Sequence, residues 1–219
     1  MKYTILGHCN VTLGIALDSI YSRHGSAEVE IVSNLNPSEN RFEEMPYLHE
    51  KMQVREFHAD EWAPNGSEQL ILSGMSPKVK KTIFEYFDEK FSIARENFVP
   101  VIHASAVITN GVELSNSVHI SPLSVVAQYA KLGDFVSLNR SVSIGHHTEV
   151  GEYTSVNPGC NIGGNCKIGK NVVIGIGATV FDDIEIGDGA VIGGGAVVTK
   201  NVEANTLVYG SPAIFIRNV

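Results

Sequence analysis

The chain has 219 residues with 16 Lys or Arg and 24 Asp or Glu, which gives a formal net charge of −8 at pH 7. This length holds one or two domains with sizeable cores, and the negative charge, without a long Lys/Arg run, argues against a nucleic-acid partner. No stretch reaches the roughly 18 consecutive apolar residues of a membrane span, and residues 1–20 are too interrupted by polar side chains for a signal peptide. We therefore expect a cytoplasmic protein.

Residues 1–98 show no six-residue period and predict a small α/β domain. The predicted elements are, in chain order, strand 3–6, helix 11–22, strand 29–32, a short strand near 54–57 in an otherwise loop-like stretch, strand 69–72 and an amphipathic helix that starts at Pro77. This order predicts a mostly parallel sheet. We also expect the domain to cover one end of the structure that follows, whose strand edge would otherwise stay unpaired.

The first predicted turn, Gly7-His8-Cys9-Asn10, lies between a strand and a helix, where a helix N-terminus often binds phosphate. It lacks the G-x-G-x-x-G spacing of dinucleotide-binding turns. Two interpretations stay open for this turn. It contacts a nucleotide phosphate, or it is an ordinary strand–helix connection.

Residues 102–203 carry a hexapeptide repeat. Ile, Leu or Val stands at every sixth position from Ile102 to Val198, 17 times without a slip, and Gly follows directly in eight hexads. A period of six predicts short strands separated by corners, stacked in parallel so that the aliphatic residues form one apolar column. The glycines would let the backbone turn a tight corner without a Cβ penalty.

Three cysteines with no C-x-x-C spacing do not indicate a metal site. Cys160 and Cys166 both fall four residues after an aliphatic position, which is the second inward position of the repeat. We therefore expect them to behave as small core residues.

The hexad Ile144-Gly145-His146-His147-Thr148-Glu149 carries the clearest chemistry. Ile144 and Thr148 are inward positions, so His146 and His147 should lie on a corner or an outer face. An imidazole titrates near neutral pH and suits a general base. The alternative is a solvated surface pair without function.

The stretch from Asn139 through GHHTEVGEYTSVNPG, with the later GGGAVVTKNV and YGSPA, resembles the hexapeptide-repeat sugar acetyltransferases of bacteria. These include the sialic acid O-acetyltransferase-like group and the nucleotide-amino-sugar N-acetyltransferases. The resemblance implies a Rossmann-like acceptor domain over residues 1–98 and a left-handed parallel β-helix over 99–219, with three hexads per coil. It also implies a homotrimer that binds acetyl-CoA between adjacent β-helices and transfers the acetyl group directly to an amine or hydroxyl of a nucleotide-linked sugar.

The resemblance assigns roles to particular residues of this sequence. With 18 residues per coil, Gly164 would stack on His146 and leave a notch with an exposed N–H, which could face the thioester carbonyl as charge develops. The implied site consists of the base His146 with His147 beside it, the cofactor contacts Gly164, Ile176 and Gly194, the sugar contact Asn139, and Gly7, His8 and Asn10 on the nucleotide side.

The sequence departs from the family pattern in three places. His147 stands where the family usually has an acidic residue beside the base, and Ser155 replaces a histidine often found near the acetyl group. The first turn lacks its second glycine, and Ser33, Asn34 and Asn36 replace the acidic residues expected after the second strand. The resemblance therefore does not fix a UDP-sugar as the acceptor.

Three other interpretations stay open. Histidines 103, 119, 146 and 147 could hold zinc, as in hexapeptide-repeat carbonic anhydrases, although their spacing is not that of a ligand set, and we expect no metal. The chain could be a non-catalytic trimeric scaffold, or it could acylate a small molecule that is not a sugar.

Overall fold

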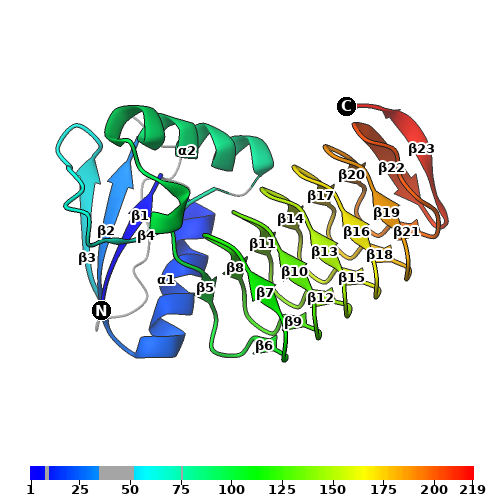
Figure 1. The fold of residues 1–219 in the computed structure, drawn as a ribbon, viewed down its shortest axis with the longest axis horizontal. Coiled ribbons are helices and arrows are strands. Elements are labelled where there is room, and N and C mark those ends of the chain that lie inside the picture. The colour runs from blue at the N-terminus through cyan, green and yellow to red at the C-terminus, as the bar shows by residue number, and fades with distance from the viewer. Residues whose placement is uncertain (8–9, 35–51, 75) are drawn as a thin grey trace.

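The N-terminal part of the chain folds around a four-stranded sheet in the computed structural model (Figure 1). The structure describes residues 1–7, 10–34, 52–74 and 76–219, without the side chains of residues 10 and 11. The elements of this part are β1 (Lys2–Leu6), α1 (Asn10–His24), β2 (Ala27–Ser33), β3 (Met52–His58), β4 (Gln69–Leu72), α2 (Pro77–Phe91) and a 3-10 turn at Arg95–Asn97. They match the predicted order. The helix α2 starts at Pro77 and β4 spans 69–72 as predicted, while α1 and the other strands are one to three residues longer than expected.

The sheet has the strand order β3-β2-β1-β4, and all three strand pairs are parallel. Alternate residues of each strand point to opposite faces. Leu6, Val32 and Leu70 therefore pack with α2 in one buried cluster, while Ile5 and Ile31 pack with α1 in another. The result is a three-layer α/β/α arrangement, and the parallel sheet that the sequence predicted is its middle layer.

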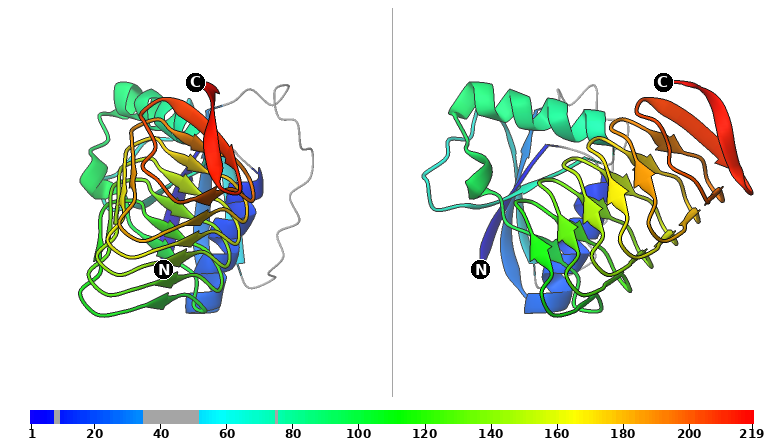
Figure 2. Two further views of the ribbon diagram at one scale, coloured as in Figure 1. Left: turned by 90° about the vertical axis from the view of Figure 1, so that its right-hand side faces the viewer. Right: turned by 45° about the vertical axis from the view of Figure 1, so that its right-hand side comes forward.

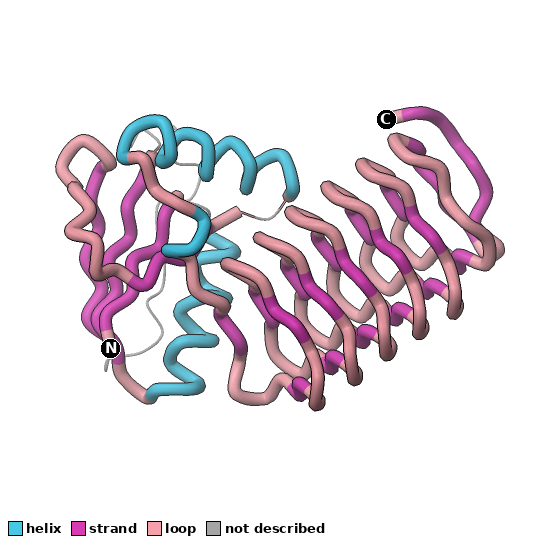
Figure 3. Tube along the Cα trace, in the orientation of Figure 1, coloured by secondary structure: helices cyan, strands magenta, loops and turns pink. Residues whose placement is uncertain are grey.

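Seventeen two-residue strands follow and form three parallel sheets, visible as short magenta segments between corners in Figure 3. We name these sheets B, C and D. Sheet B holds β5 (Val101–Ile102), β8 (His119–Ile120), β11 (Ser137–Leu138), β14 (Ser155–Val156), β17 (Val173–Ile174) and β20 (Val191–Ile192). Sheet C holds β6 (Val107–Ile108), β9 (Val125–Val126), β12 (Ser143–Ile144), β15 (Asn161–Ile162), β18 (Thr179–Val180) and β21 (Val197–Val198). Sheet D holds β7 (Glu113–Leu114), β10 (Lys131–Leu132), β13 (Glu149–Val150), β16 (Lys167–Ile168) and β19 (Glu185–Ile186).

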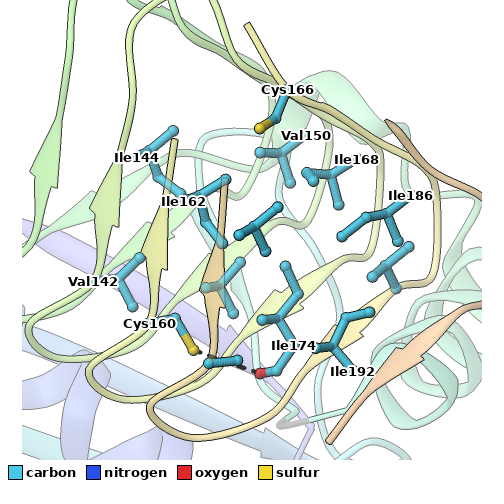
Figure 4. Close-up of a cluster of buried hydrophobic side chains, with 14 of the residues drawn as sticks. Val142, Ile144, Val150, Cys160, Ile162, Cys166, Ile168, Ile174, Ile186 and Ile192 are labelled. Carbon is cyan, nitrogen blue, oxygen red and sulfur yellow. Dashed lines mark hydrogen bonds between the residues drawn. The ribbon is translucent and has the colours of Figure 1, made fainter. Parts of the chain in front are cut away.

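Every strand pairs with the strand one coil away, as Ser143 does with Asn161 18 residues later. The coils are triangular when seen end-on (Figure 2), and no hexad carries an insertion. The aliphatic positions point inward and form one continuous core, with Cys160 and Cys166 buried among them as predicted (Figure 4). Burial raises the pKa of both thiols.

The glycines after the aliphatic residues have a different cause from the one predicted. Positive φ falls two positions later, in every hexad from residue 111 to residue 195, as at His147 with φ 58°. The glycines are required by close approach of the next coil, because a Cβ on Gly145 would lie 2.3 Å from the carbonyl carbon of Gly163. A Cβ on Gly151 would lie 2.6 Å from the carbonyl carbon of Gly169 in the same way.

The chain ends in a hairpin of β22 (Thr206–Gly210) and β23 (Ala213–Asn218). β22 pairs in parallel with β20 and so continues sheet B, but β23 runs antiparallel to β22 at the edge. The sequence suggested that this tail is a lid on the last coil. Only β22 extends the stack, because the β23 side chains Ile214, Phe215 and Ile216 are exposed.

The N-terminal domain lies against both the end and the side of the β-helix (Figures 1 and 2). At the end, α1 covers the edge of β5, where Arg23 Nε donates to Ile102 O (3.0 Å) and Ala104 N donates to Ser22 Oγ (3.1 Å). At the side, α2 inserts Lys80 into the corner between sheets D and B. Its Nζ donates to Phe135 O (2.7 Å) and to Ser137 Oγ (3.2 Å). The predicted cover of the end is therefore present, and the contact extends along sheet B.

Neither helix described in the N-terminal domain has the length and apolar character needed to cross a bilayer, and the rest of the described chain contains no helix longer than a 3-10 turn.

Lys80 should make the stability depend on pH, because burial lowers its pKa from 10.5 to about 7. Between these values the unfolded chain binds more protons at this residue than the folded chain, so the free energy of unfolding should rise as pH increases from 7 to 10. The slope from one such group reaches at most about 1.4 kcal/mol per pH unit. Urea unfolding at pH 7, 8 and 9.5 should show this rise in the wild type and a flatter profile in Lys80→Met. Equal slopes for the two proteins would contradict the assignment.

Candidate active site

His146 and His147 lie on the corner between β12 of sheet C and β13 of sheet D, and both are exposed. Their Nδ1 atoms are 3.2 Å apart, a hydrogen-bond distance, and the rings meet edge-on at 84°. One Nδ1 must therefore carry the proton and the other the lone pair. The Tyr129 ring, one coil earlier, packs on His147 with centroids 5.0 Å apart.

Gly164 stacks on His146 as predicted, but the expected open notch is absent. A Cβ on Gly164 would lie 2.7 Å from Cε1 and 2.8 Å from Nε2 of His146, so the imidazole itself fills that space and Gly164 is buried. The Gly164 N–H is also occupied, because it donates to Asp182 Oδ1 at 2.6 Å. The expectation of a free N–H for an oxyanion at Gly164 is therefore wrong for this structure.

The Asp182 contact belongs to a recurring corner motif. Asp134 Oδ1 accepts from Asn116 N (3.0 Å) and Asp188 Oδ1 accepts from Lys170 N (2.8 Å), each from the corner 18 residues earlier. A carboxylate at this corner position therefore ties one coil to the previous one. At Gly164 the same motif brings a negative charge next to the residue that supports the His146 ring.

The other predicted cofactor contacts lie on a different corner. Ile176 and Gly194 stack on the corner between sheets B and C, where a Cβ on Gly194 would lie 3.2 Å from Ile176 Cγ2. Both are exposed, Ile176 by 60 %. Gly164 and this pair therefore sit at the two edges of sheet C and are not gathered into one pocket of the protomer.

The residues predicted to contact the acceptor are not gathered at one place in the structure. Gly7 is buried with φ 92°, its N–H donates to Val32 O (2.9 Å), and a Cβ would meet Ile83 at 2.7 Å. The turn and the packing against α2 therefore explain why residue 7 is a glycine, and the Gly7 N–H is not free to bind a phosphate. His8 lies outside the described residues, and Asn10 is the first residue of α1. Asn139 lines a small cavity between α1 and sheet B, where Thr12 is also found.

Two residues in this region were not assigned a site role from the sequence. Lys80 reaches the β-helix from α2, and His119, considered only as a zinc ligand, lines the same cavity as Asn139. His119 could have been singled out, because it is the one histidine among the residues that directly precede an aliphatic position of the repeat. It lies on sheet B, away from His146 and His147, and no group of three His, Cys, Asp or Glu in the described chain is arranged to hold a metal.

A hollow of 890 Å³ contains none of the predicted site residues. It is a shallow groove along sheet D, whose outward residues alternate between Glu and Lys. Lys131–Glu149 (3.8 Å) and Lys167–Glu185 (3.3 Å) form exposed ion pairs along it. Its charged lining indicates a solvated face.

Comparison with known proteins establishes the fold. The bacterial transferase hexapeptide family (six repeats) matches residues 165–200, and no curated protein sequence matches the chain. A mutant of perosamine N-acetyltransferase from Caulobacter crescentus, solved with CoA and GDP-perosamine, is similar at TM-score 0.77 and 20% identity, covering 99% of this chain and 97% of that one. The acetyltransferase domain of PglB from Neisseria gonorrhoeae FA1090, solved with acetyl coenzyme A, is similar at TM-score 0.80 and 18% identity over 98% of both chains.

A third structure, WeeI from Acinetobacter baumannii AYE, is similar at TM-score 0.77 and 20% identity, covering 99% of this chain and 100% of that one. The whole chain therefore has the fold that the sequence predicted. It is a small parallel α/β domain followed by a left-handed parallel β-helix.

The stacking of His146 on Gly164 can be tested directly. In Gly164→Ala the new Cβ must displace the exposed His146 ring, so we expect the Tm to stay near that of the wild type while the Nδ1–Nδ1 contact is lost. If the ring takes part directly in a reaction, the rate of that reaction should fall on the order of 10²-fold, the usual cost of misplacing a reacting group by about 1 Å. A crystal structure and a thermal melt check both points. Gly14→Ala, where a Cβ meets nothing within 4 Å, is the control.

Proposed function

We propose that the protein is an acetyl-CoA-dependent acetyltransferase that acts on an amine or hydroxyl of a nucleotide-linked sugar. The observation that carries the proposal is the exposed His146–His147 pair, held on a β-helix corner with one imidazole oriented by the other. Similar structures with CoA and GDP-perosamine and with acetyl coenzyme A support it, since each matches nearly the whole chain.

His146 acts as the general base in this proposal. If its Nδ1–H donates to His147 Nδ1, its Nε2 lone pair is free to take the proton of the acceptor as the acceptor attacks the acetyl carbonyl. The tetrahedral intermediate then expels the coenzyme A thiolate, and the imidazolium returns the proton to that sulfur. His147 thereby orients the base from the position where the family usually has an acidic residue. No protein nucleophile is needed, and Cys160 and Cys166 are buried in the core.

A neighbouring copy of the chain completes the site. The outward residues of sheet C carry no charge, in contrast to sheet D; they are Val107, Val125, Ser143, Asn161, Thr179 and Val197. Exposed apolar residues flank this face, including Leu123 (66 %), Tyr129 (57 %) and Phe181 (52 %). An uncharged face with an apolar rim is typical of a subunit interface.

The position of the site residues agrees with this assembly. His146 lies at one edge of sheet C, whereas Ile176 and the Asn139 cavity lie at or beyond the other edge. A trimer packed along sheet C would place the His146 corner of one protomer near the opposite corner of the next. The acetyl-CoA groove would run between them, with Ile176 and Gly194 as contacts on one side and with Gly164, behind the His146 ring, on the other. Because acetyl-CoA is a cytoplasmic metabolite, we place the enzyme in the cytoplasm.

His146→Ala should fold and assemble like the wild type yet lose transfer. General-base catalysis contributes about 10²–10⁴-fold, so kcat should fall by that range. His147→Ala should lose less, and His147→Glu should keep most of the rate, because a carboxylate can accept the same Nδ1–H. The measurement is thiol release from acetyl-CoA with a panel of nucleotide amino-sugars and free sugars, GDP-perosamine included. If His146→Ala keeps the wild-type turnover and only His147→Ala loses it, the assignment of His146 as the base is wrong.

The proposed interface predicts a second outcome. Val125→Glu places a charge on β9, in the otherwise uncharged outer face of sheet C, so the trimer should dissociate and transfer should be lost together. Val79→Glu makes the same charge change at a residue of similar exposure on α2 (43 % against 39 %) and should keep both properties. Light scattering during gel filtration gives the mass of each variant. An active Val125→Glu monomer would show that one protomer holds a complete site.

A further inference from the structure

Under the N-terminal domain, sheet B carries a histidine whose hydrogen-bonding capacity is not used. His119 is the outward residue of β8 and stands in register with Ser137, which stands in register with Ser155. Its Nε2 is buried, with no hydrogen-bond partner among the residues that the structure describes. Native structures rarely leave such an atom unsatisfied, so it calls for a ligand or a water.

The atom borders a cavity between α1 and sheet B. Its lining residues include the polar side chains of Thr12, His119, Asn139 and Asn157 beside apolar surface, and the cavity volume is 30 Å³. A water needs about 10–15 Å³ measured in this way, so the space accepts one or two waters or one polar substituent of a ligand. It does not accept a whole sugar ring.

The charges around the cavity define what that substituent can be. Burial, with the nearby Lys80, lowers the pKa of His119 to about 4, so the imidazole is neutral at pH 7 and offers one N–H and one lone pair. Lys80 Nζ is held by Phe135 O, Ser137 Oγ and, at 3.5 Å, Thr154 O. No carboxylate side chain is among the lining residues to pair with an ammonium group. An uncharged hydroxyl, which both donates and accepts, fits these partners.

We propose that this cavity receives one hydroxyl group of the acceptor sugar and that His119 Nε2 forms a hydrogen bond with it. His119 is then a specificity-determining residue that selects acceptors bearing that hydroxyl, at a distance from the base at His146. That the ligand is a sugar rests on the proposed function. The unpaired His119 Nε2 and the cavity beside it are observed independently of that function.

The test is His119→Leu, which removes the buried unsatisfied atom. The Tm should stay equal or rise, while the acceptor KM and Kd should increase about tenfold, the usual scale for one buried hydrogen bond. The kcat and the KM for acetyl-CoA should not change. A deoxy acceptor that lacks the hydroxyl should bind the wild type about tenfold more weakly and bind His119→Leu no worse than the parent sugar does.

His103→Leu is the matched control, because His103 already has partners in Ser105 Oγ (2.8 Å) and Asp18 Oδ2 (3.4 Å). Its loss should lower or maintain the Tm and leave acceptor binding unchanged. A His119→Leu protein with a lower Tm and an unchanged acceptor KM would show that His119 is only structural and would overturn the inference.

Calorimetry with GDP-perosamine and UDP-glucosamine, without acetyl-CoA, separates this inference from the proposed function. If binding weakens in His119→Leu but the wild type transfers no acetyl group, the role of the cavity in ligand binding is supported and the enzyme assignment is overturned. If transfer occurs and is unchanged in His119→Leu, the role of the cavity in acceptor binding is overturned, whereas the enzyme assignment is supported. If the wild type shows no binding and no transfer with these probes and the acceptor panel, both the cavity inference and the proposed function are overturned.

Discussion

The stacking of coils at a fixed interval of 18 residues is the constraint on which the structure depends. Each coil bonds to the next through backbone groups, so the neighbours of a corner residue are the residues 18 positions before and after it. A side chain can therefore stand on a corner only if the next coil leaves room. His146 lies over Gly164 for this reason, because any larger residue would collide with its ring. The candidate site is thus a column of equivalent positions as much as a motif along the chain.

Much of the architecture could be predicted because burial in a β-helix follows sequence period directly. One aliphatic residue in six identifies the core, and the positions of Cys160 and Cys166 in that frame identify their burial. In the N-terminal domain the apolar runs are short, but their order is enough to indicate a parallel sheet. The corner glycines were placed correctly and explained wrongly. Sequence shows that a residue is small, and only the backbone shows whether φ or a neighbouring coil requires it.

The parts that could not be predicted depend on contacts between segments far apart in the chain. Periodicity places His119 on an outer face, but it does not show that the N-terminal domain covers that face. Lys80 meets Phe135 and Ser137 across more than 50 residues, so an amphipathic helix pattern gave no indication of its role. The hydrogen bond from Gly164 N–H to Asp182 is of the same kind. Each is set by which side of the prism a second element occupies.

The neighbours of His146 suggest how this corner compensates for the missing acidic partner. A neutral His147 can fix the tautomer and orientation of the base, but it supplies no negative charge to an imidazolium. Asp182 Oδ1 is 2.6 Å from Gly164 N, and Gly164 lies directly against the His146 ring. A carboxylate therefore bonds to the glycine on which the imidazole stacks, two coils away from the ring itself. In the proposed mechanism His147 orients the base directly, and Asp182 contributes by fixing the Gly164 backbone against which the imidazole packs.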